Sequence, residues 1–274
     1  MKIYIMYEVG GAMGYVNPKA GDDPETRQAV TAEVNAAIAG AAEAGASEFV
    51  VNTGCPPANH VMLDKVDPRA QVIRGLWKPD QTMEGIDGTF DAMFVLSMHA
   101  KAHTPRAVFS HTWSLNIYDY RVNGTSIGEL GMAAYFAAAV GVPTVLVSGD
   151  TATCEEAKAL LGDVEVAPTK ESISWIAAKC PPPSVVLQRI HDAARRAIER
   201  LGDFKPVQLA SPVTVEINMA NPTLIPWWLW VPTVEPLGPS GIKFQAPDYR
   251  AAHRLFMVLQ KVELAYYVES GMPI

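Results

Sequence analysis

The sequence predicts an α/β protein with a mainly parallel sheet flanked by helices, followed by a smaller C-terminal α+β part. Over residues 1–166, short apolar runs alternate with alanine-rich segments of helical length, which is typical of right-handed βαβ units. After a proline-rich break at "CPPPS" (180–184), the pattern changes to one helix, two strand-like runs and a last helix. We therefore expect two domains, residues 1–166 and residues 167–274.

The elements of the first domain follow from local sequence. The apolar run "KIYIMYEV" (2–9) predicts a strand, because it is rich in β-forming residues and stops at a glycine-rich loop. Residues 25–44 predict a helix that ends at Gly45, a residue type favoured at helix C-termini. The remaining predicted elements are strands over 48–52, 90–97 and 143–149, and helices over 126–140 and 153–161.

The second domain is expected to hold a helix over 184–201, strands over 213–219 and 241–246, and a final helix over 247–268. Between its two strands lies the segment "IPWWLWVP" (225–232). Its tryptophans either pack beneath a long loop, form a subunit contact, or line a pocket for an apolar substrate. Packing or an oligomer contact is the favoured interpretation.

Composition excludes several classes of function. The formal charge of −7 over 274 residues, without a basic run, argues against a nucleic-acid partner. Three widely spaced cysteines without a CxxC pair do not form a disulfide framework. No apolar stretch reaches the length of a membrane span, and the first residues lack a secretory leader. We expect a cytoplasmic protein.

The stretch "LSMHAKAHTPRAVFSHTW" (96–113) holds three of the six histidines, namely His99, His103 and His111. It begins where a predicted buried strand ends, and ligands of open parallel sheets bind outside the carboxyl ends of the strands. A single histidine there is most often an ordinary loop residue. Three together indicate a functional site.

Other side chains with suitable chemistry are predicted at the same edge of the sheet. The first strand ends at Glu8, the second is followed by Cys55, and the third by His99. Glu129 lies in the first turn of a helix, after the loop with His111. All four strand-end and helix residues are of metal-ligand types. Each alone also has a structural explanation, such as a buried apolar thiol or a carboxylate that complements the helix dipole.

The chain resembles the DppA-type zinc D-aminopeptidase family over nearly its whole length. The resemblance is carried by "MKIYIMYEVGGAMG", "FSHTW", "NGTSIGELGMAAYFAAAVGVPTVLVSGD" and "IKFQAPDYRAAHRLF", among other ordered matches. It implies a binuclear zinc amide hydrolase that assembles into a large ring-shaped homo-oligomer, a decamer. The substrate would be a small amide or peptide.

The resemblance carries roles to particular residues. It implies that Glu8 stands where the family has the bridging aspartate, and that His99 and Glu129 keep their roles as metal ligands. The histidine of the "SH" motif, which the family is thought to use in catalysis, is His111.

Other positions of the family's site differ in this chain. Gly10 replaces a ligand glutamate and Cys55 replaces a ligand histidine, while His60 is five residues off register. We therefore expect one ion per chain, with Cys55 as a ligand or near-ligand. Trp175 stands where the family usually has arginine, which suggests a more apolar substrate surface.

Three classes of function remain open at this point. The first is a metal-dependent hydrolase of a small amide or peptide that uses zinc, with His111 as general acid or base. The second is a metal-free amidohydrolase with Cys55 as the nucleophile. The third is a non-catalytic family scaffold.

Overall fold

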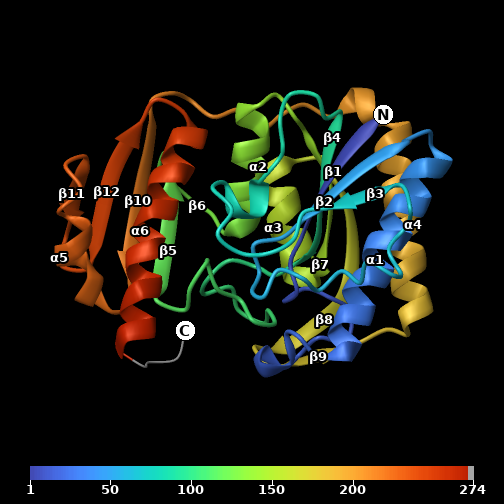
Figure 1. Cartoon of the computed structure of the whole chain (residues 1–274), viewed down its shortest axis with the longest axis horizontal. Helices are drawn as coiled ribbons and strands as arrows, with labels where there is room; N and C mark the ends of the chain where they lie inside the picture. Colours follow the sequence, from blue (N-terminus) through green and yellow to red (C-terminus); the bar gives the residue numbers. More distant parts are fainter. Residues whose placement is uncertain (271–274) are drawn as a thin grey trace.

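The computed structural model describes residues 1–270, and its larger sheet is the predicted parallel one. Seven strands lie in the order β3-β2-β1-β4-β7-β8-β9, and all neighbours are parallel except β8 and β9 (Figure 1). Their bounds are β1 Lys2–Tyr7, β2 Glu48–Asn52, β3 Ala70–Val72, β4 Ala92–Met98, β7 Thr144–Asp150, β8 Glu165–Ser174 and β9 Ala177–Lys179. The fold class predicted from the sequence is confirmed.

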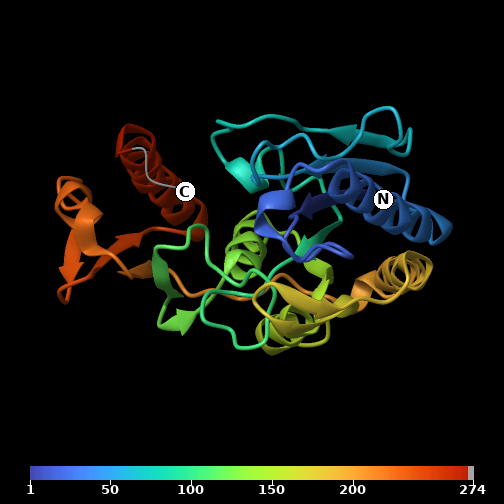
Figure 2. The same cartoon turned by 90° about the horizontal axis from the view of Figure 1, so that it is seen from below.

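Helices cover both faces of this sheet because its central strands are apolar on both sides. Helices α1 and α4 lie on one face of the sheet, and α2 and α3 lie on the other (Figure 2). Ile3 and Ile5 of β1 belong to the apolar cluster that includes α1 and α4, whereas Tyr4 and Met6 belong to the cluster that includes α2 and α3. Alternate residues of a strand point to opposite faces, so a strand buried on both is a continuous apolar run. The helices are α1 Pro24–Glu43, α2 Glu129–Ala139, α3 Thr151–Leu161 and α4 Pro183–Glu199.

A second sheet is antiparallel and has the order β11-β12-β10-β5-β6. Strand β10 alternates buried and half-buried residues, and α6 packs over the sheet. One face of such a sheet is apolar and the other is solvated. The bounds are β5 Ile117–Val122, β6 Thr125–Ser126, β10 Val213–Met219, β11 Val234–Leu237, β12 Gly241–Ala246 and α6 Tyr249–Ser270.

Local sequence predicted neither β3, β8 and β9 of the first sheet nor β11 of the second. It also did not predict β5 and β6. They form a hairpin whose turn residues Asn123 and Gly124 have φ of 49° and 82°, the backbone that an Asn-Gly hairpin turn adopts. The pair joins the second sheet through β10. The domain boundary between residues 166 and 167 stays a prediction. The two sheets divide the chain in another way: β5 and β6 lie in the second sheet, although they precede residue 166. Strand β8 lies in the first sheet and α4 packs against that sheet, although both extend beyond residue 166.

The tryptophan-rich segment forms the short helix α5 (Ile225–Trp228) at the outer end of the second sheet (Figure 1). Trp228 is fully buried, and its Nε1 donates a hydrogen bond of 3.0 Å to the carbonyl of Leu259. Trp227 and Trp230 are 50% and 74% exposed. One tryptophan therefore packs in the core, and the other two face outward.

Within residues 1–270, no helix combines the length and the apolar character that a membrane span requires.

Candidate metal centre

The carboxyl ends of β1 and β4 bring the first two candidate residues together. The two strands are parallel neighbours, and the backbone nitrogen of Glu8 donates to the carbonyl of Leu96 at 2.9 Å. His99 directly follows β4, and both Glu8 and His99 are buried. Glu129 is the first residue of α2, where the positive end of the helix dipole favours a carboxylate.

Three side chains converge at this edge of the sheet. Nε2 of His99 lies 3.3 Å from Oε1 of Glu129, and Nε2 of His111 lies 3.6 Å from the same oxygen. Among the described residues, these three form a group whose potential ligand atoms all lie within 4.8 Å of one another. The backbone nitrogen of Trp113 also donates to Oε1 of Glu129, at 2.8 Å. The structure therefore brings His99, His111 and Glu129 together, whereas Glu8 and Cys55 of the predicted ligand set lie outside this group.

Backbone carbonyls fix the tautomer of both imidazoles. Nδ1 of His99 lies 3.1 Å from the carbonyl of Ala100, and Nδ1 of His111 lies 2.7 Å from the carbonyl of Phe109. Because a carbonyl only accepts, each Nδ1 carries a proton. In the neutral rings the Nε2 lone pairs then face Glu129. Metal-binding histidines usually have this second-nitrogen contact.

The spacing between His99 and Glu129 suits a metal ion. The Nε2 lone pair of His99 and the carboxylate of Glu129 repel each other unless a proton or a cation lies between them. Ligands that lie about 2.0–2.1 Å from a tetrahedral zinc are roughly 3.3 Å apart. The 3.3 Å between His99 and Glu129 meets that requirement.

Burial and charge set the protonation of these groups. Burial lowers the pKa of His99, but the Glu129 carboxylate and its hydrogen bond outweigh burial and raise the pKa to about 9. Burial raises the pKa of Glu129, and His99 reverses this and lowers the pKa to about 2. Burial and the charge of His99 lower the pKa of His111 to about 4. Without metal, a proton on His99 therefore balances Glu129, and His111 is neutral.

Glu8 and Cys55 lie next to this cluster. Burial and the charge of Glu129 raise the pKa of Glu8 to about 8, while a hydrogen bond with Cys55 opposes the rise. Burial and Glu8 raise the pKa of the Cys55 thiol well above its usual value. Both groups are thus protonated at neutral pH, and both lie close enough to interact with the charges of the three-residue cluster.

Gly10 carries no side chain that could bind an ion. A Cβ at Gly10 would lie 3.0 Å from both Cβ and Cδ2 of His99, so the imidazole fills the space into which a longer side chain would extend. His60 is buried beside Tyr7, and neither of its ring nitrogens has a hydrogen-bond partner in the described chain. His103 lies against Tyr118 instead, with ring centroids 4.1 Å apart and an interplanar angle of 42°.

A buried lysine that the sequence patterns did not reveal supports the site. Lys170 is 1% exposed, and its Nζ donates to the carbonyls of Gly10 and Ala12, at 2.8 Å each. Glu33, fully buried, accepts from the backbone nitrogen of Met13. Together they hold the loop after β1. The sequence signal is a charged residue within an apolar strand or helix, where it must have partners.

Aromatic side chains continue outward from His111. The rings of Phe109 and His111 lie 4.5 Å apart, and those of Phe109 and Trp175 lie 5.1 Å apart. Trp175 is fixed by a 3.1 Å hydrogen bond from its Nε1 to the carbonyl of Ser110. An apolar surface therefore lies beside the cluster.

Known proteins match this chain over nearly its whole length. A family model described as D-aminopeptidase matches residues 1–258. The chain belongs to the D-aminopeptidase family. A curated member, the D-aminopeptidase of Bacillus subtilis (strain 168), is 30% identical over 270 residues, which cover 96% of this chain and 98% of the relative.

A solved structure of the D-aminopeptidase family shares the fold. It is the Zn-dependent D-aminopeptidase DppA from Bacillus subtilis, described as a self-compartmentalizing protease. The TM-score is 0.93 at 30% identity, over 96% of this chain and 98% of the solved one. The family resemblance inferred from the sequence is confirmed.

Proposed function

We propose that this chain is a metal-dependent hydrolase of amide bonds in small peptides or related amides, with one divalent ion, zinc, per chain. The observation that carries the proposal is the 3.3 Å approach of Nε2 of His99 to Oε1 of Glu129, with Nε2 of His111 beside them at 3.6 Å from the same oxygen. Support comes from a solved relative described as a Zn-dependent D-aminopeptidase. D-Amino-acid peptides are therefore the first substrates to test.

His99 and Glu129 would hold the ion, with Glu8 and Cys55 as further candidates. A zinc ion bound there would lower the pKa of a water and polarise a carbonyl oxygen. Gly10 offers no side chain to a second ion, and the ring of His99 occupies the adjacent space. A remodelled, mononuclear site accounts for both features.

His111 would accept or donate a proton during hydrolysis. Its ring stacks on that of His99, with centroids 4.0 Å apart and an interplanar angle of 20°. Nearly parallel stacked rings direct their lone pairs side by side, so one ion cannot lie on both axes. His99 is then the ligand, and His111 is a general base or acid. Burial and the charge of His99 lower the pKa of His111 to about 4, which leaves Nε2 free to accept a proton.

The metal-free cysteine mechanism is the weaker alternative. A nucleophilic cysteine needs a lowered pKa or an adjacent base. Burial and Glu8 instead raise the pKa of the Cys55 thiol. The role of ligand or near-ligand suits Cys55 better, because a metal deprotonates a thiol that binds it. A non-catalytic scaffold would not need the ordered tautomers of His99 and His111.

The substrate surface next to His111 is proposed to be apolar. Phe109 and Trp175 form it, and Trp175 is 38% exposed. Apolar side chains gain free energy when they bury area against such rings. Substrates with an apolar side chain near the scissile bond should therefore be preferred over charged ones.

We further propose a homo-oligomer, in the form of a ring-shaped decamer. The solved relative is described as self-compartmentalizing. Trp227 and Trp230, whose rings lie 4.7 Å apart on the outer side of the second sheet, offer an apolar contact surface. A cytoplasmic location agrees with Cys55, Cys154 and Cys180, which are free thiols.

Elemental analysis combined with a hydrolysis assay tests the proposal. The purified protein should contain one equivalent of zinc, hydrolyse a panel of D-amino-acid dipeptides, and lose activity when a chelator removes the metal. Activity in metal-free protein, together with a covalent adduct on Cys55, would support the cysteine mechanism. Metal binding without hydrolysis of any amide would favour a scaffold.

A further inference from the structure

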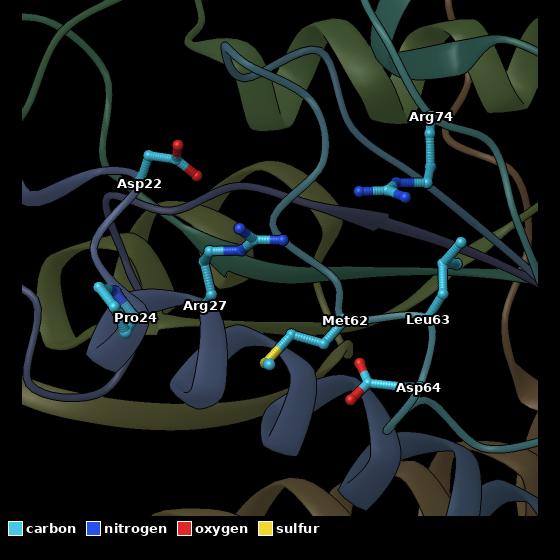
Figure 3. A pocket seen from close by; sticks show the side chains of 7 residues that line it. All are labelled: Asp22, Pro24, Arg27, Met62, Leu63, Asp64 and Arg74. Carbon is cyan, nitrogen blue, oxygen red and sulfur yellow. The ribbon is translucent and has the colours of Figure 1, made fainter.

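A cavity lies apart from the cluster of His99, His111 and Glu129. It is open, has a volume of about 490 Å³, and lies between the start of α1 and the loop after β2 (Figure 3). The residues that line it are Asp22, Pro24, Arg27, Met62, Leu63, Asp64 and Arg74. The proposed metal centre uses none of them.

Two arginines of this cavity converge on one backbone oxygen. Nη2 of Arg27 and Nη2 of Arg74 each donate to the carbonyl of Asn59, at 3.2 Å in both cases. Nε of Arg27 is buried without a hydrogen-bond partner in the described chain. Among residues 1–270, neither guanidinium forms an ion pair with a carboxylate within 4.0 Å.

Neither guanidinium is therefore paired directly with an anionic group of the described chain. Two guanidinium groups that share a neutral carbonyl repel each other, and most of their donors stay unpaired. A carboxylate relieves both problems, because its two oxygens accept from a guanidinium in a bidentate manner. The cavity is therefore complementary to a carboxylate.

The two acids of the cavity indicate that its ligand also carries a positive group. Asp22 and Asp64 lie on different sides of the arginines (Figure 3), and they bring the formal charge of the lining to zero. A dianion such as phosphate would be repelled by these acids, whereas an ammonium group would be attracted. Met62 and Leu63 add apolar surface. A zwitterion with a small side chain matches all three properties.

We infer that this cavity binds the zwitterionic form of an amino acid or short peptide, with its carboxylate on Arg27 and Arg74. That the zwitterion is an amino acid or peptide rests on the proposed function, since such molecules are the substrates and products of a peptide hydrolase. The site is coupled to the metal centre by one short loop. Asn59 follows Cys55 by four residues, and the nitrogen of Ala58 donates to the carbonyl of Cys55 at 2.7 Å.

Titration calorimetry of metal-free protein tests this inference, because it needs no turnover and removes binding through a metal. The probes are alanine and dialanine of both stereochemistries, acetate, methylamine and inorganic phosphate. Arg27→Gln and Arg74→Gln remove the two guanidinium groups one at a time. Arg69→Gln is the matched control, because Arg69 lies on the same segment but pairs with Asp67.

At least one alanine or dialanine should bind the wild-type protein more tightly than acetate, methylamine or phosphate does. Arg74→Gln should weaken that binding at least tenfold, and Arg69→Gln should leave it unchanged. Arg74 is exposed, so this variant stays informative even if Arg27→Gln does not fold. Equal binding in the wild type and in Arg74→Gln, no binding of any zwitterion, or tighter binding of phosphate would each overturn the inference. Failure of hydrolysis with intact binding would count against the proposed function alone.

Discussion

His99 and Glu129 face each other at the end of the parallel sheet, with 3.3 Å between Nε2 of the imidazole and Oε1 of the carboxylate. One comes from the end of β4 and the other from the first turn of α2. In the absence of metal, the proton on His99 provides the positive charge that Glu129 requires. A metal ion must displace that proton, and this competition makes metal binding dependent on pH.

Metal binding should release protons at pH 7. The charge of Glu129 raises the pKa of His99 to about 9 against the effect of burial, so a bound ion displaces about one proton from His99. Burial and Glu129 raise the pKa of Glu8 to about 8, so Glu8 adds nearly a second proton if it is a ligand. Affinity for metal therefore rises with pH up to about 9. Calorimetry in buffers of different ionisation enthalpy measures the number of protons released per metal ion bound.

Glu8→Gln is the diagnostic variant for this experiment. It should lower the count of released protons by about one and weaken metal binding if Glu8 is a ligand. An unchanged count would exclude Glu8 from the coordination sphere. Release of no proton by the wild-type protein would contradict the protonation state assigned to His99.

Substitution of the two histidines should have different effects. His111→Ala should keep the metal but lower kcat by ~10²–10⁴, the usual contribution of a general acid or base. His99→Ala and Glu129→Ala should each lose the metal, as measured by elemental analysis after gel filtration. Metal loss from His111→Ala would show that His111 is a ligand, and our division of roles would be wrong.

Gly10→Ala should weaken metal binding by displacing His99. The new methyl group would lie 3.0 Å from the imidazole, closer than such atoms normally approach. We expect at least a tenfold lower affinity for zinc with little change in the unfolding midpoint. Gly202→Ala is the control, because a Cβ there meets no atom within 4 Å. Equal zinc affinity in both variants would mean that Gly10 does not constrain the ligand.

Cys55 should react slowly with iodoacetamide in metal-free protein at pH 7. Burial and Glu8 raise the pKa of the thiol, and only the thiolate is an effective nucleophile. Cys55→Ser should weaken zinc binding and retain activity that added zinc partly restores. A thioester trapped on the wild-type thiol, detected by mass spectrometry of the intact chain, would instead establish the cysteine mechanism.

Lys170→Met should destabilise the protein and weaken metal binding together. The change leaves the carbonyls of Gly10 and Ala12 without their donor and removes a positive charge near buried Glu33. Buried groups left unpaired cost about 1–3 kcal/mol each. Urea denaturation measures the loss of stability, with the exposed Lys179→Met as a control. Equal midpoints for the two variants would show that Lys170 does not hold the loop.

Hydrophobic patterning predicted β1, β2, β4 and β7 of the large sheet, and β1, β4 and β7 are continuous apolar runs buried on both faces. It did not predict β3, β8 or β9, whose sequences contain no such run. It missed β5 and β6, because their membership of the second sheet depends on pairing with β10, almost a hundred residues later. The alternation in "IYDYRV" and the Asn-Gly turn were the available signals. Pairing over such a distance is not encoded in local sequence.

The convergence of His99 and Glu129 followed from topology, because parallel strands end at one edge of the sheet. The orientation of the imidazoles could not be predicted from topology. It depends on carbonyls of the loop after β4, including that of Phe109, whose φ is 51°, a conformation that non-glycine residues rarely adopt. Likewise, the contact between His99 and residue 10 appears only once the side chains are placed.

The close approach of His99 to Gly10 also restricts how this site could be redesigned. An acid introduced at residue 10 would press on the imidazole of His99, because even a Cβ there lies 3.0 Å from that ring. A designed ligand at residue 10 would therefore need a shift of the loop after β1 as well as the substitution itself.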